Sequence, residues 1–118
     1  MSRNDSERIA DILRAITKCR RYIAKVDAAS VDLNETALDA IERNLQIIGE
    51  ATNHLSASTI NQHPDIPWPQ IRGFRNILVH QYFGVDFDVV KEVVEVHLEP
   101  LKQALMSTEY PPTGEDDQ

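Results

Sequence analysis

The sequence lacks the residues on which several classes of protein depend. Its single cysteine, Cys19, leaves no partner for a disulfide within the chain, and we expect a packing role for it. The four histidines form no HExxH motif and no Cys/His cluster, so we expect neither a metal site nor a cofactor. There is no glycine-rich phosphate loop. Without a signal-like start or a long apolar run, the expected protein is cytoplasmic, with no membrane span.

Negative charge dominates, but it is unevenly distributed. The net charge of −7 at pH 7 disfavours non-specific binding of nucleic acid through bulk charge. Residues 1–30, however, hold seven Lys/Arg against four Asp/Glu, whereas the rest of the chain holds five against fifteen. A local basic cluster results, made of Lys18, Arg20, Arg21 and Lys25. It is either a solvated helix face or a track for the phosphate backbone of RNA.

Two long segments have apolar residues at alternating steps of three and four, which predicts helices. In residues 5–26, with Asp5 or Ser6 as the expected N-cap, these positions are Ile9, Ile12, Ile16, Cys19, Ile23 and Val26. In residues 32–55, where Asp32 and Glu35 have capping-box spacing, they are Leu38, Ile41, Leu45, Ile48, Thr52 and Leu55. Because a short connection joins the two segments, we expect them to pair antiparallel, as in a helical bundle.

The segment that follows cannot be one continuous helix, because it contains Pro64, Pro67 and Pro69. We expect Trp68 to bury its ring and pin this connection to the bundle; the alternative is a platform on which a base stacks. Pro69 suits the first position of a third helix, which should end near residues 83–84.

Residues 86–99 are rich in valine, but a lone strand would have no partner, so we predict a helix. Its apolar positions are Phe87, Val90, Val94, His97 and Leu101. Pro100 should kink or divide this helix. Residues 107–118 read as a disordered acidic tail. The sequence therefore predicts one all-α domain over residues 1–106, an up-and-down bundle of four to five helices, followed by that tail.

Residues 71–82 predict a helix with two different faces. On an ideal helix with Arg75 at zero, the apolar residues fall between roughly 200° and 320°: Ile71, Phe74, Ile77 and Leu78. Arg72, Arg75, Asn76 and His80 fall between about 0° and 140°, and Tyr82 returns to within about 20° of Arg75. Most polar helix faces are simply solvated. This one has no Lys or Glu, and instead carries arginine, which suits phosphate, and histidine, which moves protons near neutral pH.

The sequence Arg75-Asn76-Ile-Leu-Val-His80-Gln-Tyr82 resembles the Arg-x4-His-x-Tyr motif of the HEPN superfamily, and in particular that of the minimal HepT toxins. The polar residue after the arginine, the upstream Trp68-Pro69 and the helical layout of residues 5–106 extend this resemblance.

The resemblance implies a HEPN-like homodimer in which two motifs face each other across the two-fold axis. It also implies a metal-independent endoribonuclease with Arg75 and His80 as catalytic residues, forming a 2′,3′-cyclic phosphate end. Such a protein is the toxin of a type VII HEPN–nucleotidyltransferase (MNT) toxin–antitoxin system. Its partner, a cognate nucleotidyltransferase antitoxin, neutralises it by attaching AMP to the tyrosine of the motif, here Tyr82.

Three further residues are candidates for supporting roles. Arg72 and Asn76 lie on the polar face, and Glu50, late in the second helix, either is a surface carboxylate or orients Arg75 or His80. Arg75 and His80 are about 140° apart on an ideal helix, so either the long arginine reaches round or each acts with its symmetry mate. Two other functions stay open: a non-catalytic helical binding module, and a nucleotide-binding accessory protein of a nucleotidyltransferase.

Overall fold

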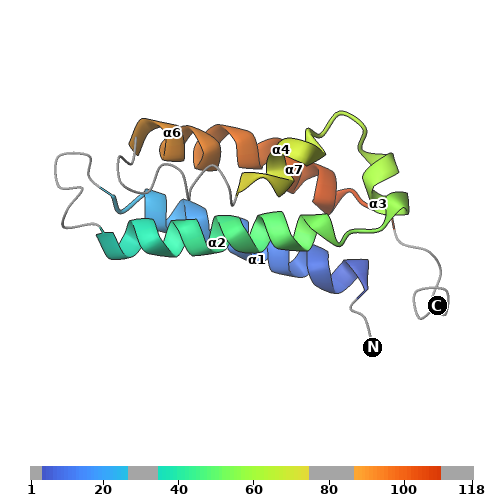
Figure 1. The fold of residues 1–118 in the computed structure, drawn as a ribbon, viewed down its shortest axis with the longest axis horizontal. Coiled ribbons are helices and arrows are strands. Elements are labelled where there is room, and N and C mark those ends of the chain that lie inside the picture. Colours follow the sequence, from blue (N-terminus) through green and yellow to red (C-terminus); the bar gives the residue numbers. More distant parts are fainter. Residues whose placement is uncertain (1–3, 27–34, 75–86, 110–118) are drawn as a thin grey trace.

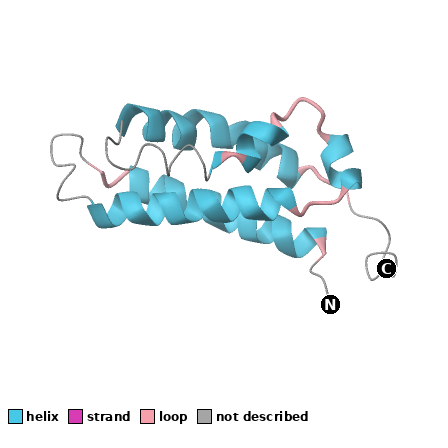
Figure 2. Ribbon diagram, in the orientation of Figure 1, coloured by secondary structure: helices cyan, strands magenta, loops and turns pink. Residues whose placement is uncertain are grey.

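The computed structural model describes residues 4–26, 35–74 and 87–109, and these ranges contain helices and no strand (Figures 1 and 2). The α-helices are α1 (Asp5–Ile23), α2 (Glu35–Asn53), α3 (Ala57–Gln62), α4 (Trp68–Arg72), α6 (Phe87–Glu92) and α7 (Leu98–Met106), and the π-helix η3 (Val93–His97) joins α6 to α7. The prediction of an all-α helical bundle is confirmed. None of the described helices is long and apolar enough to cross a membrane.

α1 and α2 form the predicted antiparallel pair, and the consecutive helices η3 and α7 pack against α1 (Figure 1). The predicted seams lie in the core, since Ile12, Ile16, Cys19, Ile41 and Ile48 are all at most 1% exposed. Burying one such aliphatic side chain contributes about 1.5–3 kcal/mol, so these seams hold the hairpin together.

Cys19 has the packing role that its position predicts. Its thiol is fully buried and donates a weak hydrogen bond to the carbonyl oxygen of Ile41, at 3.8 Å. Burial raises the pKa of the Cys19 thiol to about 12, so the reactive thiolate does not form near neutral pH.

The N-cap of α1 is Asn4, so the prediction of Asp5 or Ser6 was wrong by one or two positions. The Asn4 side chain accepts a hydrogen bond from the backbone N–H of Glu7 at 3.0 Å. Asn caps as well as Asp or Ser does, so local sequence does not separate the three. Asp5 is thereby left to bond elsewhere, and its carboxylate accepts hydrogen bonds from the Ser56 backbone N–H, at 3.1 Å, and from the hydroxyls of Ser56 and Thr59.

The connection between α2 and α4 is held by hydrogen bonds rather than by continuous helix. Trp68 is 5% exposed, and its indole N–H donates to the carbonyl oxygen of His63 at 2.9 Å. The predicted anchoring role of Trp68 is therefore confirmed, and its buried ring is not a platform for a base. α4 begins at Trp68, with Pro69 in its first turn, where a missing N–H costs nothing.

The last long helix is divided, as Pro100 predicts, but the division lies upstream of the proline. In η3 the N–H of Leu98 bonds to the carbonyl of Val93, five residues back, and Pro100 then lies in the first turn of α7. The wider π-helical turn adds a residue and shifts the buried stripe by one position. Leu98 is therefore fully buried and His97 is exposed, contrary to the prediction that His97 belongs to the apolar face.

The chain beyond α7 is tied to α3 as far as Glu109. The Gln62 side chain donates to the carbonyl oxygen of Glu109 and accepts from its backbone N–H, both at 2.9 Å. His63 Nε2 lies 2.9 Å from the Thr108 hydroxyl. α3 thus contacts the beginning of α1 through Asp5 and the end of the described chain through Glu109.

α2 and α4 approach each other closely at Gly49. A Cβ atom at this position would lie 3.3 Å from the carbonyl oxygens of both Ile71 and Arg72. The last turn of α4 therefore rests directly on α2 (Figure 1). Because residue 75 follows only three residues later, this approach sets where the predicted catalytic segment begins.

We predict that Gly49→Val lowers the free energy of unfolding by about 1–3 kcal/mol, because its γ carbons must displace two backbone carbonyls. Gly49→Ala is the matched control. Its single Cβ meets the same oxygens at a tight distance, while alanine gains up to about 1 kcal/mol of helix propensity over glycine, so the net change should be small. Urea unfolding followed by circular dichroism measures both, and equal stability of the two variants would contradict the close approach.

Candidate functional site

The four motif residues Arg75, Asn76, His80 and Tyr82 lie outside the described residues, so their predicted roles stay predictions. What the structure does describe is the scaffold that leads into them. α4 ends at Arg72, Gly73 caps it by donating its N–H to the carbonyls of Pro69 and Gln70, both at 3.1 Å, and Phe74 follows.

The prediction of one helix that runs from Pro69 through residues 71–82 was wrong, because α4 ends at Arg72 and Gly73 caps it. The described residues on either side of this break still differ in exposure in the predicted way. Ile71 is 3% exposed and Phe74 is 7% exposed, so the first half of the predicted apolar stripe is in the core. Arg72, on the predicted polar side, is exposed. The segment therefore enters residue 75 with its apolar side fixed against the bundle and its polar side at the surface.

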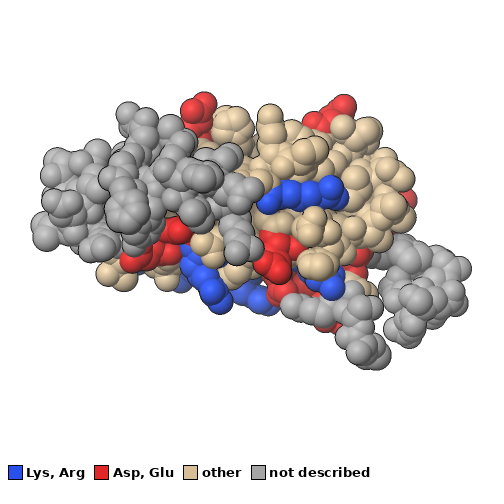
Figure 3. Space-filling model, viewed as in Figure 1, with Lys and Arg blue, Asp and Glu red and all other residues tan. Residues whose placement is uncertain are grey.

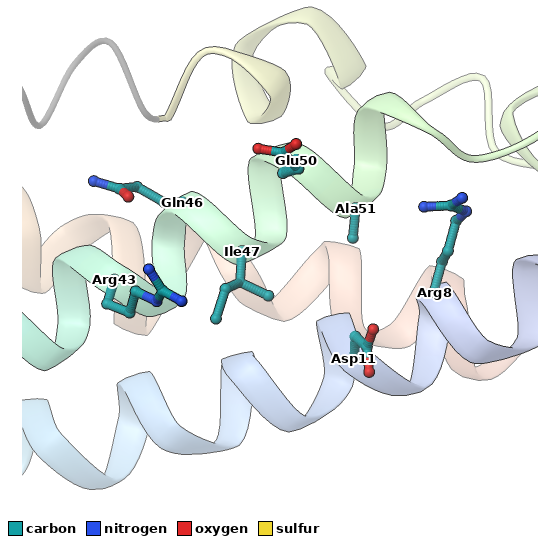
Figure 4. Close-up of a pocket in the computed structure, with 7 residues that line it drawn as sticks. All are labelled: Arg8, Asp11, Arg43, Gln46, Ile47, Glu50 and Ala51. Carbon is teal, nitrogen blue, oxygen red and sulfur yellow. The ribbon is translucent and has the colours of Figure 1, made fainter. Parts of the chain in front are cut away.

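Glu50 lies beside this entry point. It follows Gly49, on which the last carbonyls of α4 rest, and Figure 4 shows its carboxylate on the side of α2 that faces α4. Glu50 is exposed, and within the described ranges neither Glu50 nor Arg72 forms an ion pair. The structure thus brings Glu50 and the start of the motif segment together, as sequence spacing alone could not establish.

A shallow pocket of about 310 Å³ adjoins Glu50 on the surface formed by α1 and α2 (Figure 4). Its lining combines two arginines, two carboxylates, an amide and an apolar floor: Arg8, Asp11, Arg43, Gln46, Ile47, Glu50 and Ala51. Sequence reasoning did not find this pocket. The available signal was the spacing of Arg43, Gln46 and Glu50, which places all three on one face of α2.

The basic cluster of Lys18, Arg20, Arg21 and Lys25 is divided by the fold. The Arg20 guanidinium pairs with the carboxylate of Glu99 on α7. Hydrogen bonds to Glu99 from Arg20 and, second, from Gln103 lower the pKa of the Glu99 carboxyl below its usual range. Glu99 is far from Arg20 in sequence, so no local pattern could reveal the pair.

The remaining three cations of this cluster lie on the outer side of α1, together with Arg14, whose Nη1 is 3.3 Å from Asp11 Oδ1. Lys18, Arg21 and Lys25 form no ion pair with any residue that the structure describes. On the face shown in Figure 3, basic and acidic side chains alternate rather than form one continuous basic surface. Within the described ranges, no group of three His, Cys, Asp or Glu side chains could hold a metal ion.

Comparison with known proteins gives consistent relatives. The model of the family described as "Ribonuclease HepT-like" matches residues 12–108. The chain is 30% identical over 104 residues to the protein named "Putative RNase MJ1380" of Methanocaldococcus jannaschii, covering 87% of this chain and 95% of that one. It is 30% identical over 102 residues to "Probable ribonuclease HepT" of Thermococcus cleftensis, covering 86% and 93%. No solved structure matches the chain significantly.

Proposed function

Because the chain belongs to the ribonuclease HepT-like family, we propose that it is a metal-independent endoribonuclease whose chemistry is carried by Arg75 and His80. The observation that carries this proposal is the family match over residues 12–108, which includes the whole Arg-x4-His-x-Tyr motif. The names of the two relatives that span almost the whole chain support it. The exposed Arg72 and the buried Ile71 and Phe74 support a polar motif face at the surface.

In the proposed reaction, the ribose 2′-hydroxyl attacks the adjacent phosphorus, and the bond from phosphorus to the 5′ oxygen breaks. His80 takes the proton of the 2′-hydroxyl, and the departing 5′ oxygen gains a proton, so the products are a 2′,3′-cyclic phosphate and a 5′-hydroxyl. Arg75 binds the non-bridging oxygens and stabilises the negative charge that builds up on them. No oxidant, reductant or metal ion is needed for this balance.

Supporting groups surround these two residues in the proposal. Glu50 orients Arg75 or His80, which its place beside the last carbonyls of α4 supports. Asn76 and Arg72 bind the RNA or the imidazole from the same helix face. Lys18, Arg21 and Lys25 provide a weak track for the phosphate backbone, to which Arg20, already paired with Glu99, contributes less.

We predict that Arg75→Ala and His80→Ala each lower the cleavage rate of a single-stranded RNA by about 10²-fold or more, the scale of one acid–base or oxyanion group. Both variants should keep the helical circular-dichroism spectrum of the unchanged protein.

Addition of EDTA should leave the unchanged protein active. A folded His80→Ala variant that cuts at the original rate, or activity that EDTA abolishes and magnesium restores, would overturn the mechanism.

The same assay separates the two alternative functions. A non-catalytic binding module would leave RNA intact even with all motif residues present. A nucleotide-binding accessory protein would also leave RNA intact, but would bind ATP or AMP in a calorimeter. Neither alternative is favoured by a particular observation on the described residues.

We further propose that the active protein is a homodimer, because Arg75 and His80 are about 140° apart on one ideal helix. A cleft between two copies could combine Arg75 of one copy with His80 of the other. The surface of such an interface is the same patch on both copies.

The expected mass by light scattering is twice the 13.4 kDa of one chain. A mixing experiment tests the shared cleft more sharply. In a mixed dimer of Arg75→Ala and His80→Ala chains, one cleft loses both residues and the other keeps both. Mixing two inactive proteins should therefore restore about a quarter of the original activity for random pairing. Dimers that remain inactive after exchange would show that each chain supplies its own pair.

We also propose that this chain is a toxin regulated by a partner nucleotidyltransferase, and that the partner attaches AMP to Tyr82. On an ideal helix Tyr82 lies on nearly the same line as Arg75, about 10 Å further along the axis. AMP attached there would bring a phosphate charge toward Arg75 and occupy the groove that RNA enters.

We predict that Tyr82→Phe retains most of the nuclease activity but escapes neutralisation by the partner, because it lacks the hydroxyl that accepts AMP. Co-expression with the partner, followed by mass spectrometry of the intact chain, measures the modification. A mass increase of one or more AMP units should appear on the unchanged protein and not on Tyr82→Phe. Equal increases on both, or neutralisation without any increase, would contradict the role of Tyr82.

A further inference from the structure

Of the residues that line the pocket between α1 and α2, only Glu50 has a part in the chemistry proposed above, and the composition of the pocket suits one kind of ligand. Arg8 and Arg43 lie at its two ends in Figure 4; Gln46 lies at the Arg43 end, and Glu50 lies between the two arginines. Ile47 and Ala51 add an apolar surface. Arginine forks bind phosphate, carboxylates and amides bind hydroxyl and amino groups, and apolar side chains accept the face of a base.

The ion pairs among the described residues do not involve Arg8 or Arg43, so both arginines are available to bind a ligand. Asp11, the second carboxylate of the pocket, lies 3.3 Å from Arg14. Neither Arg8 nor Arg43 forms an ion pair with any described residue. A guanidinium is charged at all physiological pH values, so each of the two presents a permanent positive charge to a ligand.

The dimensions of the pocket are also informative. Its volume of about 310 Å³ is at the lower end of the range for sites that hold small organic groups. Arg43 and Ala51, the α2 residue nearest Arg8 in Figure 4, are eight positions apart, which corresponds to about 12 Å along the helix axis. The two positive ends are thus far enough apart to leave room for a sugar and a base between them.

Glu50 connects this pocket to the start of the motif segment. It lines the pocket, and its neighbour Gly49 lies against the carbonyls of Ile71 and Arg72. Glu50 therefore lies between the pocket and Arg72, where α4 ends ahead of the motif segment.

We propose that this pocket is a nucleotide subsite of the ribonuclease, which holds one nucleotide of the RNA strand next to the cleaved bond. Arg8 and Arg43 bind backbone phosphates on its two sides, and Gln46 hydrogen-bonds its ribose hydroxyls or base edge. The inference rests on the proposed ribonuclease function. Because these residues bind RNA away from the reacting bond, they act on the affinity for RNA and not on the chemical step.

The experiment compares the cleavage of one single-stranded RNA oligonucleotide by the unchanged protein, Arg8→Ala, Arg43→Ala and Lys91→Ala. Lys91 is an exposed cation on α6 that does not line the pocket, so it controls for loss of one positive charge. The pocket variants should raise KM about tenfold, the effect of losing roughly 1.4 kcal/mol, and keep kcat within about twofold. Lys91→Ala should change neither.

Salt dependence provides a second readout that a merely structural role does not move. Each lost phosphate contact should lower the slope of log affinity against log salt by about 0.7 for a single strand. Arg43→Lys, which keeps the charge but loses the fork, should recover the slope and part of the affinity. Circular dichroism should show all variants folded.

The subsite would be overturned if KM and the salt slope were unchanged in both Arg8→Ala and Arg43→Ala. It would also be overturned if these variants bound RNA normally and lost only the binding of a protein partner. Its failure is distinct from that of the proposed function, which fails if the unchanged protein cuts no RNA. In that case fluorescence anisotropy with the same RNA still decides: weaker binding by Arg43→Ala than by Lys91→Ala supports the subsite, and equal binding refutes it.

Discussion

The close approach of Gly49 to the last two carbonyls of α4 is the constraint on which the position of the candidate site depends. α4 has only five residues, Trp68–Arg72, and so short a helix is not stable by itself. Its place comes from its neighbours: Trp68 and Ile71 are buried on one side, and on the other a glycine leaves room for carbonyls that would lie 3.3 Å from a Cβ atom. A bulky side chain on α2 at this position must push the entrance of the motif segment away from Glu50.

α3 provides the second constraint, because three separate parts of the chain are tied to it. The carboxylate of Asp5 accepts hydrogen bonds at the start of α3, and Gln62 at the end of α3 binds the backbone of Glu109. The carbonyl oxygen of His63, just after α3, accepts a hydrogen bond from the indole N–H of Trp68. The prolines of this connection exclude a long helix, and side-chain hydrogen bonds take over the positioning. Each such bond contributes only about 0.5–1.5 kcal/mol, so it is their convergence on one six-residue helix that fixes α4 relative to α1.

The features that the sequence predicted correctly are those that depend on nearby residues, above all on the regular spacing of apolar positions. The seams of α1 and α2 follow from steps of three and four, and the burial of Trp68 follows from a large ring in a proline-rich connection. The prediction of the N-cap of α1 failed because the neighbouring residues Asn4 and Asp5 are both good capping residues. The prediction for His97 failed because the helical period changes in η3, so that Leu98 takes the core position instead. The predictions also missed what only folding brings together, namely the pair of Arg20 with Glu99 and the pocket. The motif residues lie outside the described ranges, so their roles still rest on sequence and family.

A chain with a net charge of −7 cannot attract RNA through its overall field, and the fold does not collect its cations into one surface on the face shown in Figure 3. Arg20 is neutralised by Glu99, and Arg14 is shared with Asp11. Binding must therefore come from a few arginines placed where a strand can meet several of them at once. Such an arrangement sacrifices rapid, non-specific capture, because long-range attraction is weak, and it favours those RNA segments that fit the pocket and the motif segment together.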